Sequence, residues 1–457
     1  MAKLVRRQQM TGSLLAFAAT IAVMAGAGMP AALRAQQADG AAARQWIDPA
    51  LEAQQDSLQA LYQDLHAHAE LSFQETRTAA ILATRMRELG FAVTEGVGRT
   101  GVVAVLRNGS GPTVMVRTDM DGLPLEEKTG LTYASRNRQL LNGAETFTMH
   151  ACGHDLHMAW WIGAAELLNA NRQRWSGTLV FVAQPAEEGL GGAQAMLADG
   201  LYERFPRPDL AIAAHTNNGP AGGITVKDGI VSSGADGWEV VFHGRGGHGS
   251  MPSQTIDPVV MGAHFVTDLQ SVVSRERPEH SFGVISVGSF QAGSVANIIP
   301  DTATLRLTMR AFDPAVLALL NDGMRRTALA AAAMAGAPAP EFIHLGGVAP
   351  LFNDSDLVAR AMLVLGPALG EDVAYVAPHL PGAPPSEDFS LFLTGEHPVP
   401  GLFLNVGTYA PQMLDDFALR GQPVPANHSP EFAPDPALAI APGARALVLS
   451  VLSVAGT

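Results

Sequence analysis

Apolar residues recur along this chain with two periods, one typical of helices and one typical of strands. Residues 45–90 and 158–170 carry apolar side chains at helical spacing and are predicted to be helices. Four short, mainly apolar runs are predicted to be buried strands: residues 101–107, 113–118, 178–184 and 209–214. Strands that alternate with helices predict an α/β fold with a mainly parallel sheet covered on both faces.

The pattern changes near residue 227. Residues 238–243 alternate between polar and apolar, and residues 244–250 are rich in glycine. A helix, two strands, a helix and a strand are then predicted over residues 257–275, 283–287, 302–310, 314–334 and 341–345. This order is that of a ferredoxin-like α+β unit. We therefore expect an α/β domain in two parts, 45–228 and 346–457, interrupted by a smaller domain over 229–345.

The first 35 residues have the three-part layout of a secretory signal peptide. Lys3, Arg6 and Arg7 precede an apolar run over about residues 13–29, and small residues lead to Ala35. We expect residues 1–35 to be removed on export, which makes the protein periplasmic or secreted. A membrane anchor is the alternative, although the run is short of the ~20 residues that span a bilayer. No stable membrane span is expected after signal removal, and the paired arginines leave a twin-arginine route open.

Composition narrows the possible functions. Of 457 residues, 47% are hydrophobic and 16% are charged, so a large core can form and general disorder is excluded. The net charge of −14 provides no basic surplus to displace counterions, so nucleic acid is not an expected partner. The single cysteine cannot form an intrachain disulfide, so any role of its thiol is chemical.

Two segments concentrate possible metal ligands. Residues 149–157 read MHACGHDLH and place Cys152, His154, Asp155 and His157 at the start of a helix, where exposed N–H groups lower the pKa of a thiol. A buried cysteine beside surface histidines is the alternative interpretation. The strand of residues 178–184 leads into a second segment that holds a pair of adjacent glutamates.

The paired carboxylates, Glu187 and Glu188, repel each other unless a divalent cation lies between them. One can then coordinate while the other deprotonates water; a solvated acidic loop is the alternative. His215 after a predicted strand and His428 in Asn-His-Ser-Pro could each be structural when taken alone. Together these groups predict a metal site, and no nucleophile elbow, Walker loop or dinucleotide fingerprint competes with it.

The chain resembles the dinuclear-metal amidohydrolase and carboxypeptidase family of hippurate hydrolases, N-acyl-amino-acid deacylases and indole-acetyl-amino-acid hydrolases. The matching stretches follow family order: LHAHAELSFQET (65–76), VRTDMDGLPLEEKTGLTYAS (116–135), MHACGHDLH (149–157), GTLVFVAQPAEEGLGGA (177–193), GRGGHGSMP (244–252), NIIPDTATLRLTMRAF (297–312), SEDFS (386–390) and NHSPEF (427–432). The resemblance implies a zinc-exopeptidase-like catalytic domain, a lid and dimerisation domain, and a homodimer or higher homo-oligomer.

The resemblance also implies residue roles. The metal ligands would be Cys152, His154, Glu188, His215 and His428. Glu187 would be the general base and later proton donor, and Asp119 would lie just behind the ligands. His248 resembles the histidine that reaches the scissile carbonyl, often in the partner subunit's site. Asn297 and Arg310 would hold the substrate's backbone or carboxylate.

The implied reaction is metal-dependent hydrolysis of the amide bond of N-acyl-amino acids or short peptides with a free C-terminal carboxylate. The nucleophile would be a water activated by two divalent metal ions. Thiolate and imidazole ligands favour zinc or another late first-row ion over magnesium or calcium. The resemblance implies zinc, manganese, cobalt or nickel and leaves the choice among them open. Three alternatives remain: a dipeptidase or carboxypeptidase proper, a catalytically silent binding module, and a hydrolase that uses Cys152 as nucleophile.

Two stretches depart from the family pattern. The link before residue 149 is the longer SRNRQLLNGAETFT, which affects the expected shape of the substrate entrance. The usual His-x-x-Pro-Glu-Leu reads His-Ala-His-Ala-Glu-Leu over residues 66–71, a change expected to affect local structure only.

Overall fold

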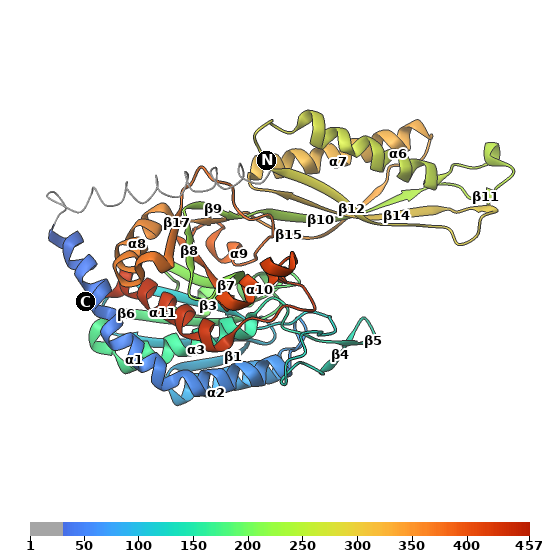
Figure 1. The fold of residues 1–457 in the computed structure, drawn as a ribbon. Helices are drawn as coiled ribbons and strands as arrows, with labels where there is room; N and C mark the ends of the chain where they lie inside the picture. Colours follow the sequence, from blue (N-terminus) through green and yellow to red (C-terminus); the bar gives the residue numbers. More distant parts are fainter. Residues whose placement is uncertain (1–30) are drawn as a thin grey trace, which may run out of the picture.

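The structure is a computed structural model that describes residues 31–457, with side chains from residue 40 onward. Its largest sheet has eight strands in the order β1-β2-β6-β3-β7-β18-β8-β17 (Figure 1). Their bounds are β1 Ala92–Val97, β2 Gly101–Asn108, β3 Thr113–Asp119, β6 Gly177–Gln184, β7 Leu210–Pro220, β8 Ile224–Lys227, β17 Val373–Val376 and β18 Gly401–Tyr409. β6, β3, β7 and β18 run parallel, as do β8 and β17, whereas β1–β2, β2–β6 and β18–β8 pair antiparallel. The predicted α/β fold with a mainly parallel sheet is confirmed.

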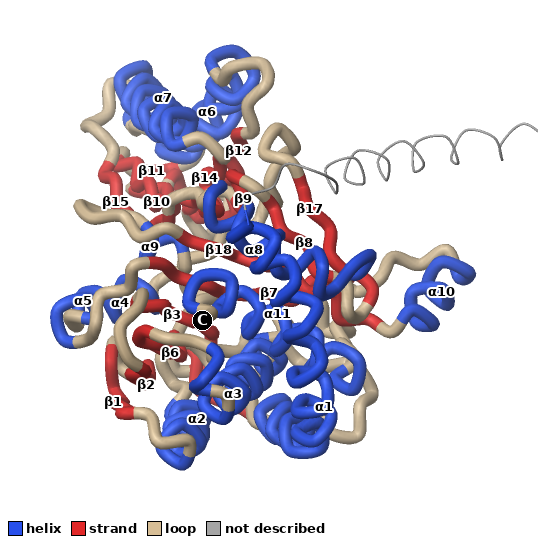
Figure 2. The backbone as a smooth tube through the Cα atoms, turned by 90° about the vertical axis from the view of Figure 1, so that its left-hand side faces the viewer, coloured by secondary structure: helices blue, strands red, loops and turns tan. Residues whose placement is uncertain are grey.

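Helices cover both faces of this sheet because its central strands are apolar on both sides. Every residue of β6 is buried, and in β2 Val102 and Val103 contribute to two different cores on opposite faces. The longer helices share one core, as Figure 2 shows for α1, α3 and α11: α1 Ala31–Ala67, α2 Thr76–Glu88, α3 His154–Ala170, α8 Ser355–Leu369 and α11 Pro436–Ala455. The short helices cover the other face: α4 Gly192–Ala198, α5 Leu201–Arg204 and α9 Ser390–Leu393.

The inserted segment forms a second sheet with its own core. Four antiparallel strands lie in the order β12-β14-β10-β15, and α6 and α7 pack on the face turned away from the eight-stranded sheet (Figures 1 and 2). The bounds are β10 Gly234–His243, α6 Pro258–Ser271, β12 Gly283–Ala292, β14 Thr302–Ala311, α7 Pro314–Met334 and β15 Glu341–Val348. This is the strand order of a ferredoxin-like unit. We call it the lid, and its boundaries in the sequence stay a prediction.

Smaller elements complete the chain. β9 Gly229–Ser232 pairs with β16 Leu351–Asn353, so the two segments that enter and leave the lid form a ribbon. β11 Gly247–His248 pairs with β13 Ile298–Ile299 at the far end of the lid. β4 Arg138–Leu141 and β5 Ala144–Phe147 form a hairpin, and α10 Pro411–Arg420 follows β18.

The structure corrects several sequence expectations. The helix predicted over 45–90 is two helices, since residues 68–75 leave the helical path to make contacts described below. β2 and β3 follow each other in the chain but are not neighbours in the sheet, because β6 lies between them. α3 begins at His154, earlier than expected, and β7 continues past His215 to Pro220. The longer link before residue 149 contains the β4–β5 hairpin.

Two expectations concern membranes. Residues 1–30 of the predicted signal peptide lie outside the described residues. Within the described residues one helix, α11, is long and apolar enough to cross a membrane by length and composition, a stretch that the sequence analysis did not single out. In this structure 61% of its most apolar window is buried, in the core shared with α1, α3 and α8.

Candidate metal centre

The turn before α3 positions two of the five predicted ligands. Gly153 has φ of 85°, and a Cβ there would lie 2.7 Å from Thr216 Oγ1, so the close approach of this turn to β7 favours glycine between Cys152 and His154. His154 Nδ1 donates to the carbonyl of Asp121 at 2.7 Å, so in the neutral ring Nε2 is the nitrogen that can bind a cation. That Nε2 is buried and has no hydrogen-bond partner among the described residues, so it is free to bind a cation.

The turn after β6 carries the paired glutamates. Ala186 has φ of 48°, a left-handed conformation, and a Cβ on Gly192 would come within 1.5 Å of the Pro185 carbonyl, so the turn is tightly folded. Glu187 Oε2 and Glu188 Oε1 each lie 3.9 Å from His154 Nε2.

The two remaining histidines approach from other segments. His215 Nδ1 donates to the Thr216 carbonyl at 2.7 Å, and its Nε2 lies 3.4 Å from Cys152 Sγ. His428 has φ of 69°, and its Nε2 lies 3.3 Å from Glu188 Oε2. The loop that carries it is tied to the turn before α3, because Asn427 Nδ2 donates to the Cys152 carbonyl at 3.0 Å.

The five predicted ligands therefore lie together. Cys152 belongs to two groups whose ligand atoms lie within 4.8 Å of one another, one with His154 and His215 and one with Glu188 and His428. A third such group joins His154 to both glutamates. One thiol, three ring nitrogens and a carboxylate form a donor set that would hold late first-row divalent ions. The unpartnered His154 Nε2 and Glu188 Oε1 agree with this fit.

Asp119 lies directly behind these ligands, as expected. His157 Nδ1 donates to Asp119 Oδ1 at 2.6 Å, and Arg117 donates to Asp119 Oδ2 at 2.8 Å. The other ring nitrogen of His157 accepts the Thr216 N–H at 2.9 Å. Both nitrogens of His157 are thus occupied, which assigns this histidine to the support of Asp119 and not to ligation.

Burial and charge perturb the ionisation of the site. Burial first, and then the charges of Glu387 and Glu188, raises the pKa of Glu187 well above its ordinary value. Burial likewise raises the pKa of the Cys152 thiol, with the Glu188 charge adding to it. Burial opposes protonation of His154, but the charge of Asp119 and the contacts with Asp121 and Cys152 together outweigh it and raise the pKa of His154. Because metal ligands bind in their deprotonated forms, cation binding here would release protons.

The sequence analysis missed a buried ion network behind Glu187. Arg117, which is buried, donates to Glu387 Oε1 at 2.8 Å and lies 3.4 Å from Asp388 Oδ1. Gln184 Nε2 donates to the same Asp388 oxygen at 2.6 Å. Both acids lie in the stretch SEDFS (386–390), to which the sequence analysis assigned no role. The two adjacent acidic residues beside apolar segments were the sequence feature that could have indicated this network.

A second missed network lies behind the first turn of α3. His66 Nδ1 contacts Asp155 Oδ2 at 2.6 Å and its Nε2 contacts Glu127 Oε1 at 3.2 Å, with all three side chains buried. Burial disfavours the charged ring, but the two carboxylates outweigh it and raise the pKa of His66 to about 9. Asp155 is therefore engaged by His66 and is not available as a ligand.

The three predicted site residues of the lid lie in different places relative to the main domain. His248 in β11 and Asn297 just before β13 are exposed, and β11 lies at the outer end of the lid (Figure 1). Ser250 N–H donates to His248 Nδ1 at 3.1 Å, so the ring proton of the neutral side chain lies on Nε2. Arg310 is half-buried in β14 and donates to Ser386 Oγ at 2.8 Å, across the boundary between lid and main domain. Its charge is among the causes, after burial and two histidines, that lower the pKa of His428.

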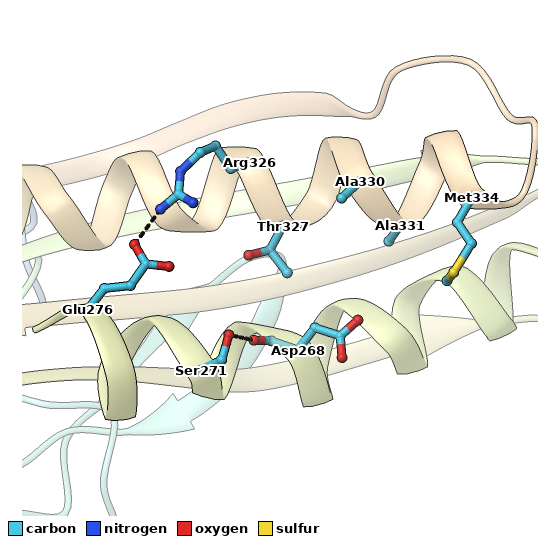
Figure 3. Close-up of a pocket in the computed structure, with 8 residues that line it drawn as sticks. All are labelled: Asp268, Ser271, Glu276, Arg326, Thr327, Ala330, Ala331 and Met334. Carbon is cyan, nitrogen blue, oxygen red and sulfur yellow. Dashed lines mark hydrogen bonds and ion pairs between the residues drawn. The ribbon is translucent and has the colours of Figure 1, made fainter.

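Two cavities lie apart from this centre. One, of about 350 Å³, opens between α6 and α7 on the lid beside the Arg326–Glu276 ion pair (Figure 3). The other, of about 510 Å³, lies where the ribbon meets the start of α8. In the described part of the chain neither is lined by a predicted ligand.

Known proteins with similar sequences indicate the family of this chain. The chain is 40% identical to the hippurate hydrolase of Campylobacter jejuni over 57% of its length and 65% of that protein. It is 35% identical to the N-acetylcysteine deacetylase of Bacillus subtilis over 76% of its length and 86% of the relative. Among solved structures, the Bacillus subtilis YXEP protein, a dinuclear metal binding peptidase, superposes with a TM-score of 0.68 at 30% identity, covering 88% of this chain and 99% of that one.

The sequence profile of one peptidase family matches residues 115–413, which include four of the five predicted ligands and both glutamates. His428 lies beyond the matched residues, and the structure brings it to the same centre. The chain is thus a hydrolase of the amidohydrolase and peptidase class, and it belongs to peptidase family M20/M25/M40.

Proposed function

We propose that this protein hydrolyses the amide bond of N-acyl-amino acids, or of short peptides, that bear a free C-terminal carboxylate. The convergence of Cys152, His154, Glu188, His215 and His428 beside Glu187 is the observation that carries the proposal. Two relatives, a hippurate hydrolase and an N-acetylcysteine deacetylase, support this substrate class.

Each residue has a part that its surroundings support. When bound, two divalent cations would supply Lewis-acid polarisation of the substrate carbonyl and a lowered pKa of water. Glu187 takes the proton of the attacking water and delivers it to the departing amine, a task that suits a carboxyl whose pKa is raised by burial. Arg310, at the domain boundary, pairs with the substrate carboxylate.

The two exposed lid residues extend the proposal to an oligomer. His248 carries its ring proton on Nε2, and this N–H would stabilise the oxyanion formed at the scissile carbon. Because His248 lies in β11, at the outer end of the lid, and Asn297 lies just before β13, we assign them to the site of a second subunit in a homodimer. Export to the periplasm or medium remains part of the proposal, on the strength of the first 35 residues.

A substrate panel combined with metal analysis tests the function. The purified protein, loaded with zinc, manganese, cobalt or nickel in turn, is offered hippurate, N-acetyl-amino acids and dipeptides. Hydrolysis of the N-acyl compounds with two bound ions per chain is expected. Preference for dipeptides would identify a dipeptidase or carboxypeptidase proper, and two bound ions without hydrolysis of any substrate would identify a binding module. Full activity after chelation would instead favour Cys152 as a nucleophile.

A further inference from the structure

The turn that carries Glu187 and Glu188 requires external support. Ala186, a residue with a Cβ, adopts the left-handed φ of 48°, a conformation that costs free energy and persists only when neighbouring groups enforce it. The three backbone N–H groups at residues 186–188 point to two buried carboxylates. Ala186 N–H donates to Glu75 Oε1 at 2.8 Å, and the N–H groups of Glu187 and Glu188 donate to the two oxygens of Asp121 at 3.0 and 3.1 Å.

Asp121 also contacts the metal centre through its backbone carbonyl. Its carbonyl accepts the proton of His154 Nδ1 at 2.7 Å, and this hydrogen bond decides which nitrogen faces the cations. Ser72 Oγ donates to Asp121 Oδ2 at 2.6 Å. Asp121 therefore holds three groups of the centre at once: both glutamates through its carboxylate and one histidine through its backbone.

Glu75 has a matching set of contacts. Its Oε1 also accepts the Phe73 N–H at 2.9 Å, and its Oε2 accepts the Thr100 hydroxyl at 2.5 Å. Within the described residues neither Glu75 nor Asp121 belongs to a group of ligand atoms close enough to hold a cation. Both side chains are almost wholly buried, at 0% and 1% exposure. Their oxygens accept hydrogen bonds from N–H and O–H donors, so these residues hold neighbouring groups in place and do not bind the cation.

The segment that supplies Ser72 and Glu75 is itself held by the longer link before α3. Asn137 Nδ2 donates to the Ala69 carbonyl at 2.8 Å, and Gln74 Nε2 donates to the Leu140 carbonyl of the β4–β5 hairpin at 3.1 Å. These contacts explain why residues 68–75 leave the helical path between α1 and α2. The support thus extends from the hairpin, through this segment, to the turn of the paired glutamates.

We propose that Asp121 and Glu75 are positioning residues for the hydrolysis described above: Asp121 aims Glu187, Glu188 and His154, and Glu75 holds Ala186 in its left-handed conformation. The inference rests on the proposed function. Backbone N–H groups that donate to buried carboxyl oxygens can hold a strained turn, because an unpaired buried N–H would cost free energy. Loss of such outer support typically lowers activity or metal affinity about 10–100-fold.

The test compares Asp121→Asn and Glu75→Gln with a matched control. An asparagine at 121 keeps the shape and accepts one N–H, but its amide group opposes the second. Asp209→Asn is the control, because Asp209 Oδ2 accepts the Thr113 N–H at 2.8 Å at the opposite end of β3. We expect Asp121→Asn to lower kcat about 10–100-fold with KM changed by less than about threefold. Glu75→Gln should give a smaller fall, and the control should match the wild type.

Two readouts do not depend on turnover. Hydrogen exchange measured by mass spectrometry on metal-free protein should show faster exchange in the peptide of residues 183–192 for Asp121→Asn and not for Asp209→Asn. The visible spectrum of the cobalt-loaded protein should change for Asp121→Asn alone, because the orientation of His154 and Glu188 differs. If Asp121→Asn does not fold, Ser72→Ala, which removes one hydrogen bond to Asp121, should show the same exchange change to a lesser degree.

The outcomes separate this inference from the proposed function. Unchanged kcat, exchange and cobalt spectrum in Asp121→Asn, beside an active wild type, would overturn the positioning role. Equal effects in Asp121→Asn and Asp209→Asn would also overturn it, because the cause would then be general stability. A wild-type protein that hydrolyses no N-acyl-amino acid or peptide would refute the proposed function, while exchange and spectrum would still report on the support of the turn.

Discussion

Replacing His66 by glutamine should remove a pH-dependent part of the stability of the main domain. The ring lies between Asp155 and Glu127, both buried, and its pKa in the folded protein is raised to about 9 from 6.5. A group whose pKa is raised on folding contributes its full stability below the unfolded pKa and loses it as pH rises through the folded value. The contribution of His66 is therefore complete below about pH 6.5 and gone above about pH 9.

The magnitude follows from the two pKa values. At 1.36 kcal/mol per pH unit, the interval from 6.5 to about 9 corresponds to about 3 kcal/mol in the free energy of unfolding. No reduction for solvent screening applies, because His66 is only 1% exposed. The difference in unfolding free energy between wild type and His66→Gln should accordingly shrink by about 3 kcal/mol between pH 6 and pH 9.5.

Urea unfolding provides the assay. The fluorescence of Trp160 and Trp161, both buried in α3, reports on the main domain, and the metal-free protein is used so that ligand titration on metal release does not contribute. His68→Gln is the matched control, since His68 lies two residues away and is exposed. If the difference in unfolding free energy between the wild type and His66→Gln stays constant from pH 6 to pH 9.5, the imidazole of His66 is not charged in this network.

Three further predictions concern the metal centre. Glu187→Gln should keep both metal ions and lose about 10²–10⁴-fold in turnover, because the base is gone while the ligands remain; ordinary turnover by steady-state kinetics would contradict the assignment. Mixing inactive Glu187→Gln with inactive His248→Ala should restore part of the activity if His248 serves the partner's site, whereas mixtures that stay inactive in a proven dimer would place His248 elsewhere. Removal of metal by a chelator should abolish hydrolysis, and zinc, manganese, cobalt or nickel should restore it; activity that survives in protein shown by elemental analysis to be metal-free would exclude a metal mechanism.

How far the sequence could predict this structure depended on the kind of residue. The five candidate ligands came from the resemblance to a known family, because His215 and His428 could each be structural when taken alone and only the motifs together indicated a metal site. The strands of the main sheet were recognisable because both faces are buried, which gives continuous apolar runs such as β6. The break at residues 68–75 was missed because apolar spacing continues across it and only the tertiary contacts of Glu75 and Ser72 reveal it.

The supporting acids were harder to predict for a physical reason. Asp121, Glu127 and Glu387 would ordinarily be assigned to the surface, because a charged side chain is rarely buried without a partner. Their partners, which include backbone N–H groups, His66 and Arg117, come from distant segments. A pairing of that kind depends on the fold and leaves no local periodicity in the sequence.

The ligands enter from four separate stretches, and the last of them, His428, follows nearly all of the main domain in the chain. A polypeptide that lacks the C-terminal segment therefore lacks one of the five candidate ligands, so a site made of all five would be complete only once that segment is present. If the chain crosses a membrane unfolded, the ions available at its destination determine which ones it carries; if it crosses folded, the cytoplasm has already made that choice. If the proposed export takes place, the order of folding and transport would set the compartment in which the metal is selected.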